Sequence, residues 1–108
     1  MSPTQRSLKM MRERGYLCAI TEHWNPFAKI RQDLFGFIDI LCVGECDYDD
    51  ANIICVQTTT LAHQPERVAK IKAHPHYEFL KKSALVIVVH GWRKLKTGWE
   101  CREIEVKP

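Results

Sequence analysis

Apolar residues recur along the chain with two different spacings, and each spacing predicts a different kind of secondary structure. In Thr4–Arg14 the apolar Leu8 and Met11 stand three positions apart among charged residues, which predicts an amphipathic helix that ends at Gly15. Short apolar segments rich in β-branched or aromatic residues predict strands. These segments are Tyr16–Trp24, Gly36–Val43, Asn52–Thr59, Ala84–His90 and Trp99–Val106.

The stretches between these strands contain helix and turn signals. Pro65, Val68 and Ile71 have the spacing of a second helix, which we expect to reach about Ala73. Other stretches predict a basic loop, an acidic turn, a short helical turn and a hairpin turn, at Asn25–Asp33, Glu45–Asp50, about 77–82 and Thr97-Gly98. The order is helix, three strands, helix, two strands (αβββαββ), which predicts an α/β domain with a mixed central sheet.

Length and composition narrow the class of protein. A chain of 108 residues has room for one core, so we expect 1–108 to form a single domain. No apolar run approaches the roughly 18 residues of a membrane helix, and Met1–Arg14 lacks the apolar stretch of a secretory signal. The five cysteines lie mostly in predicted strands, which indicates reduced thiols. We therefore expect a cytoplasmic protein without a membrane partner.

The net charge of +3 permits binding to nucleic acid without requiring it, and DNA is the partner that we expect. Basic residues gather in separate groups along the chain. Those that we expect to contact phosphates are Lys29, Arg31, Arg67, Lys70, Arg93 and Lys94. For Arg67 and Lys70, a solvated helix face is the open alternative.

Asp39 is the anomaly of the second predicted strand. It lies in the apolar run Phe37–Leu41, where a carboxylate is excluded unless it is paired or binds a metal. Gln57 repeats the oddity one strand later and shares a strand face with Thr59. If that face lies opposite Asp39 in a hairpin, two oxygen ligands converge. Such ligands suit Mg²⁺ or Mn²⁺, which polarises a phosphodiester and lowers the pKa of a bound water.

At these residues the sequence resembles the PD-(D/E)XK nuclease superfamily, which includes archaeal Holliday-junction resolvases and many restriction enzymes. Gly36-Phe37-Ile38-Asp39 matches the Asp of the family motif, and Val56-Gln57-Thr58-Thr59 stands in the place of its Glu-X-Lys. The predicted order of elements is also similar to the family core. The resemblance implies a restriction-endonuclease-like fold and a metal-dependent DNA endonuclease, with branched or structured DNA as one candidate substrate.

The resemblance also implies roles for individual residues. Asp39 would hold the metal ion, Gln57 would replace the second acid of the family, and the carbonyl of Thr58 would lie beside it. The family often has a further acid in or near the first helix. We favour Glu22 over Glu13 for this role, because Glu22 closes an otherwise apolar strand.

Thr59 departs from the family motif, since it stands in the place of the lysine that orients water and stabilises developing charge. A hydroxyl cannot supply that cation. Lys70 on the second helix is the preferred substitute, and Lys29 in the basic loop is the alternative. Without a substitute the chain would be a catalytically inactive nuclease-fold module that binds DNA. A homodimer, which would reach both strands of a duplex, is a further open alternative.

Structural alternatives exist for the acidic residues as well. Asp39 alone could be a strand-end carboxylate that pairs with Arg31 or caps a backbone amide, which would leave a generic interaction domain. For Asp33 we favour a solvated loop residue with a local ion pair over a metal ligand. We assign no ligand role to the histidines His63, His74, His76 and His90.

Overall fold

The computed structural model describes residues 1–45 and 51–108, and its centre is a five-stranded sheet. Across the sheet the strands lie in the order β1 (Leu17–Ile20), β4 (Ile40–Val43), β5 (Ile53–Thr60), β6 (Val86–Leu95) and β7 (Gly98–Glu105). β5 and β6 run parallel, and the other neighbouring pairs are antiparallel. The predicted α/β class with a mixed central sheet is therefore confirmed.

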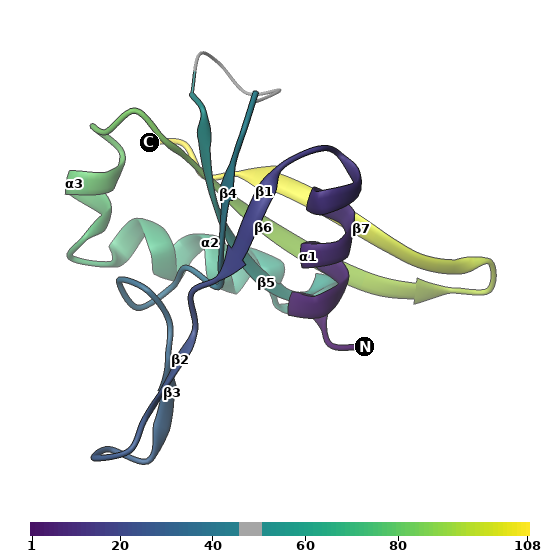
Figure 1. The fold of residues 1–108 in the computed structure, drawn as a ribbon, viewed down its shortest axis with the longest axis horizontal. Helices are drawn as coiled ribbons and strands as arrows, with labels where there is room; N and C mark the ends of the chain where they lie inside the picture. Colours follow the sequence, from purple (N-terminus) through teal and green to yellow (C-terminus); the bar gives the residue numbers. More distant parts are fainter. Residues whose placement is uncertain (46–50) are drawn as a thin grey trace.

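Helices cover both faces of this sheet (Figure 1). α1 (Pro3–Glu13) packs on one face, against β1, β4, β5 and β6. The 3-10 turn η1 (Leu61–His63) leads from β5 into α2 (Gln64–Ala73), and the short α3 (Tyr77–Leu80) follows. α2 and α3 pack on the opposite face of the sheet, so the domain has three layers.

Two apolar clusters hold these layers together, one on each face of the sheet. The cluster beneath α1 contains Leu8, Met11, Tyr16, Cys18, Ile40, Cys42, Ile54, Val56, Val86 and Val88. The cluster beneath α2 and α3 contains Phe37, Ile38, Cys55, Ile71, Tyr77, Leu80, Ile87, Val89 and Val106. Side chains alternate across a strand, so neighbouring residues of β5 and β6 enter different clusters. This explains why these strands are apolar at consecutive positions.

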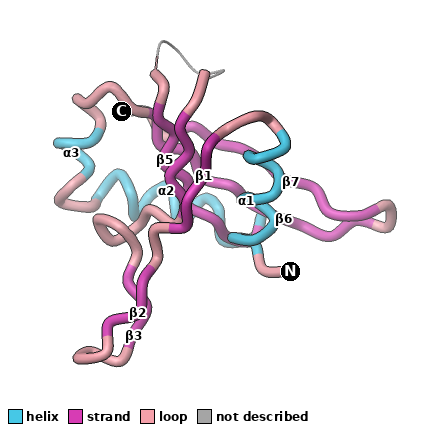
Figure 2. The backbone as a smooth tube through the Cα atoms, viewed as in Figure 1, coloured by secondary structure: helices cyan, strands magenta, loops and turns pink. Residues whose placement is uncertain are grey.

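The first predicted strand is divided in two. β1 belongs to the central sheet, whereas β2 (His23–Asn25) pairs with β3 (Ile30–Gln32), which lies inside the predicted loop. The resulting hairpin projects away from the central sheet (Figures 1 and 2). In its turn, Oδ1 of Asn25 accepts the amides of Phe27 at 3.0 Å and Ala28 at 3.1 Å. Three-residue strands are too short for a periodic pattern to reveal them.

The observed order therefore differs from αβββαββ, because it contains the β2–β3 hairpin, η1 and α3 in addition. Among the described residues, no helix is both long and apolar enough to span a bilayer. Free thiols are confirmed for Cys18, Cys42, Cys55 and Cys101. Cys46 and most of the predicted acidic turn lie outside the described residues.

Candidate functional site

Three carboxylates, from Glu22, Asp33 and Asp39, come together where the β2–β3 hairpin joins the central sheet. One oxygen of each lies within 4.8 Å of the other two. Asp39 is only 6% exposed, while Glu22 and Asp33 are half-buried. We call this group the acidic cluster. A concentration of like charge at a buried position favours a bound cation or a shared proton.

The β2–β3 hairpin brings two of these acids together. His23 pairs with Gln32 at the end of the hairpin that adjoins the sheet. The same register, continued by one residue, places Glu22 opposite Asp33. Arg31 of β3 donates to Glu22 at 2.8 Å and compensates part of the negative charge.

A tight turn between β3 and β4 brings in the third acid. Leu34 and Ile38 form an isolated antiparallel bridge, so Asp33 and Asp39 are the next facing pair outward. Gly36 closes the turn at a φ of 88°, in the left-handed region that glycine adopts without steric cost. The six-residue spacing of the two aspartates is therefore set by local backbone geometry.

Asp39 and Gln57 lie on neighbouring strands at facing positions, as the strand pattern predicts. The register pairs Ile40 with Val56, and the amide of Asp39 donates to the carbonyl of Val56 at 2.9 Å. Gln57 is only 5% exposed, and its side-chain amide bonds to no other residue that the structure describes. Buried amides usually have partners, so this one is available to a ligand.

Thr58 contacts Asp39 in a way that the family resemblance does not imply. Its amide and hydroxyl approach Oδ2 of Asp39 at 2.8 and 3.3 Å. The same hydroxyl lies 2.7 Å from that of Thr4 on α1. Asp39 therefore caps a backbone amide, which was one of its structural alternatives. This contact uses Oδ2 and leaves Oδ1 for another partner.

Asp39 also has an unusual protonation equilibrium. Burial, followed by a hydrogen bond with Asp33, raises the pKa of Asp39 from 3.8 to about 7, although the amide of Thr58 acts in the opposite direction. The carboxyl group therefore retains a proton close to neutral pH. A bound cation would replace that proton.

Two clefts meet at Gly36 and His74, and one of them reaches the acidic cluster. One, of about 450 Å³, contains Asp33 together with Arg31. The other, of about 460 Å³, contains Gln57. Both are lined by Gly36 and His74, which form a common wall. A Cβ atom at position 36 would lie 2.7 Å from Nε2 of His74, so glycine is needed for this close approach.

The cations predicted on the second helix lie beside the site. Arg67 and Lys70 of α2 line the same cleft as Gln57. Lys70 also forms an exposed ion pair with Glu66 at 3.0 Å, an interaction that contributes little to stability. The buried Thr59 brings no charge. Lys70 therefore lies at the cleft that Gln57 lines.

The other predicted phosphate contacts are dispersed. Lys29 lies in the turn of the β2–β3 hairpin, roughly 13 Å along the chain from Asp33 at about 3.3 Å per residue. Arg93 and Lys94 belong to the β6–β7 hairpin, which projects in another direction (Figure 1). Arg93 is paired there with Glu100 at 2.8 Å. The six predicted residues therefore do not form one surface.

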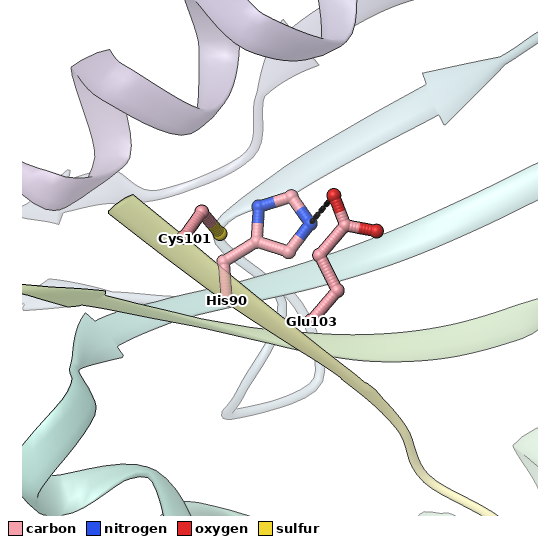
Figure 3. A group of neighbouring side chains, drawn as sticks. All are labelled: His90, Cys101 and Glu103. Atoms are coloured by element: carbon pink, nitrogen blue, oxygen red, sulfur yellow. Dashed lines mark ion pairs between the residues drawn. The ribbon is translucent and has the colours of Figure 1, made fainter. Parts of the chain in front are cut away.

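A second group of metal-ligating residue types, which we call the His90 cluster, lies beneath α1 (Figure 3). It consists of His90, Cys101 and Glu103. Glu103 is ion-paired with Arg14. Burial lowers the pKa of His90 to about 4 and raises that of Cys101 to about 12. At neutral pH the histidine and the thiol are therefore uncharged.

Ser7 of α1 connects this cluster to the helix. Its buried hydroxyl accepts the indole N–H of Trp92 at 2.8 Å and lies 2.9 Å from Nδ1 of His90. These contacts fasten α1 to β6, and the pair between Arg14 and Glu103 fastens it to β7. His90 thus has a structural role that its isolated position in the sequence does not reveal.

The local ion pair expected for Asp33 is not formed among the described residues. The residue belongs to the acidic cluster, and Arg31 pairs with Glu22 rather than with Asp33. The sequence signal that could have indicated the contact is the position of Asp33 and Asp39 on either side of Gly36, a residue that favours a turn. The preference for Glu22 over Glu13 agrees with the structure, because Glu13 lies on α1 outside the cluster.

Comparison with known proteins found no family model, curated protein or solved structure that matches the chain. Function must therefore be inferred from the site itself.

Proposed function

We propose that the protein is a metal-dependent DNA endonuclease whose active centre is the acidic cluster with Gln57. The observation that carries this proposal is the convergence of three carboxylates. The buried amide of Gln57 lies on the strand position that faces Asp39 and lines a cleft with cationic side chains. The resemblance of Asp39 and Gln57 to the PD-(D/E)XK motif supports the same function.

The donor set fits a hard divalent cation. Glu22, Asp33 and Asp39 offer carboxylate oxygens and Gln57 offers an amide oxygen, which are the ligand types that Mg²⁺ and Mn²⁺ prefer. Burial, and after it the neighbouring Asp33, raises the pKa of Asp39, so the charged form of this carboxylate is disfavoured until a cation binds. When bound, such an ion polarises a phosphodiester and lowers the pKa of a water molecule.

The chain's own cations would position the DNA. Arg31 lines the cleft that reaches the acidic cluster, and Arg67 and Lys70 line the neighbouring cleft beside Gln57, so phosphates could bind in both clefts. Lys70 would stabilise the negative charge that develops on the phosphate. Thr59, which stands in the place of the motif lysine, has no charge and cannot perform this role. Gln57 would orient the phosphate that binds in the cleft of Arg67 and Lys70.

The first experiment incubates linear, supercoiled and branched DNA with the protein in Mg²⁺, Mn²⁺ or EDTA. Cleavage is expected with either metal and not with EDTA. Asp39→Asn should reduce the rate by more than about 100-fold, because it removes a metal ligand while its amide oxygen still accepts the amide of Thr58. Undiminished cleavage by this variant would refute the site.

A matched pair of variants tests the cation. Lys70→Met should slow cleavage roughly 100-fold, the usual cost of losing one charge-stabilising group. Lys72→Met is the control, because Lys72 is an exposed residue of the same helix that does not line the cleft. Equal rates for the two variants would show that Lys70 is not the catalytic cation.

The second candidate function is a DNA-binding module without catalysis. It is favoured by the uncharged Thr59 and by the existing ion pair of Lys70 with Glu66. DNA binding that is weakened by Arg67→Ala, without cleavage under any of the conditions above, would establish this alternative.

A further inference from the structure

The β2–β3 hairpin exposes large apolar side chains far from either core. Phe27 is 97% exposed, Trp24 57% and Ile30 50%. The two strands pair only with each other and project from the central sheet (Figure 1). Isolated two-stranded hairpins are marginally stable, and clustered exposed apolar residues often mark an interaction site.

The turn that carries Phe27 is held in one conformation. Oδ1 of Asn25 accepts the amides of Phe27 and Ala28, and its Nδ2 donates to Gln32 at 3.2 Å. Lys29 adopts a left-handed φ of 55°. Such a turn holds the backbone of Phe27 in one conformation, which lowers the entropic cost of binding.

The charge of the hairpin complements a polyanion. Residues 23–32 include Lys29 and Arg31 and contain no Asp or Glu. Trp24 is the cross-strand partner of Arg31, so an aromatic and a cationic side chain leave the hairpin on the same face. Only one guanidinium nitrogen of Arg31 contacts Glu22, which leaves other donors for phosphate. Aromatic rings combined with cations are typical of surfaces that bind unpaired nucleic acid.

The hairpin is continuous with the acidic cluster, because Glu22 and Asp33 are the residues at its two ends. Its turn lies about 13 Å from them along the chain, close to four base steps of roughly 3.4 Å each.

We propose that the hairpin is a wedge that stacks Trp24 and Phe27 on unpaired DNA bases, with Phe27 about four nucleotides from the phosphate held at the acidic cluster. This inference rests on the proposed nuclease function and assigns it a substrate with a junction between paired and unpaired DNA. A tip with Trp, Phe and Lys also suits a membrane surface. The acidic cluster at its base and the cationic clefts beside it favour DNA.

The test compares a forked DNA with a fully paired duplex of the same sequence, each with 2-aminopurine near the fork position. Binding and fluorescence are measured with Ca²⁺ in place of Mg²⁺, and cleavage is measured separately with Mg²⁺. Wild-type protein should bind the fork more tightly and change its 2-aminopurine fluorescence. Phe27→Ala should bind the fork about tenfold more weakly and lose the fluorescence change.

Phe79→Ala is the matched control, because Phe79 is 82% exposed on α3, outside the hairpin. It should behave like wild type. Equal effects of Phe27→Ala and Phe79→Ala on fork binding would overturn the wedge. Sedimentation with phosphatidylserine vesicles that depends on Phe27, without an effect on DNA, would overturn the assignment to DNA.

The two proposals fail in different ways. If wild-type protein cleaves DNA and Phe27→Ala cleaves and binds the fork equally well, the wedge is refuted and the nuclease function stands. If no protein cleaves but fork binding depends on Phe27, the wedge stands and the nuclease function is refuted.

Discussion

The acidic cluster and the His90 cluster both gather metal-ligating side chains from separate segments of the chain, yet they compensate their charges differently. Beneath α1, Arg14 pairs with Glu103, Ser7 lies in hydrogen-bond distance of His90, and burial keeps the imidazole uncharged. At the hairpin base, Arg31 pairs with Glu22 as the ion-pair partner of the three carboxylates among the described residues, and burial together with the hydrogen bond to Asp33 raises the pKa of Asp39.

This difference distinguishes a cluster with a structural role from a cluster that can bind a ligand. A cluster whose charges and hydrogen bonds are satisfied by the chain contributes to folding, because removing any member leaves a buried partner unsatisfied. A cluster with uncompensated charge beside a cleft lowers the free energy of unfolding of the protein, and binding of a ligand restores it. Residue type alone does not distinguish the two clusters.

The largest expected effect is on metal binding. Mn²⁺ at 100 times its dissociation constant should stabilise wild-type protein by about 2.7 kcal/mol, or roughly 10–20 °C in Tm. Asp39→Asn should lose this shift, and Glu103→Gln should keep it, whatever its own baseline stability. Differential scanning fluorimetry with and without Mn²⁺ measures both. A shift that is lost in Glu103→Gln would assign the metal to the His90 cluster.

The second effect concerns the structural cluster. Ser7→Ala should lower the free energy of unfolding by about 2 kcal/mol, because the buried indole N–H of Trp92 loses its acceptor. Cleavage by the folded variant should be unchanged. Ser83→Ala is the control, since the hydroxyl of Ser83 makes an exposed bond to the carbonyl of Phe79. Urea denaturation measures both variants, and equal losses would contradict the role of Ser7.

The smallest effect is the pH dependence of stability, in which the two clusters oppose each other. Folded Asp39 keeps its proton up to a pKa of about 7, against 3.8 when unfolded, so its contribution falls as pH rises through this window. Folded His90 has a pKa of about 4, against 6.5 when unfolded, so its contribution falls as pH drops from 6.5 to 4. Each acts with a slope of up to about 1.4 kcal/mol per pH unit.

Urea denaturation of the metal-free protein between about pH 4.5 and 6.5 should therefore reveal opposite changes in two variants. In Asp39→Asn the free energy of unfolding should rise more steeply with pH than in wild type. In His90→Asn the free energy of unfolding should rise less steeply with pH than in wild type. Groups that do not contact these residues contribute equally to all three proteins, so the differences report Asp39 and His90 together with their neighbours Asp33 and Glu103. Parallel curves would show that neither pKa is shifted.

Several features could be predicted from the sequence because they depend on neighbouring residues. Apolar spacing gave the helices and the strands of the central sheet. Side-chain alternation placed Asp39 and Gln57 on one face, and the β4–β5 pairing then set them opposite each other. Glu22 was likewise found from its place at the end of an apolar run.

Other features were decided only by tertiary structure. Asp33 reaches Asp39 through the pairing of β2 with β3 and the bridge between Leu34 and Ile38, and neither leaves a periodic signal. His90 becomes structural because α1 packs Ser7 against it, 83 positions away in the chain. Periodicity reports which face a residue occupies, whereas the partner on that face depends on contacts between distant segments. The sequence by itself therefore determined the strand and the face of Asp39, and the tertiary structure decided which charges surround it.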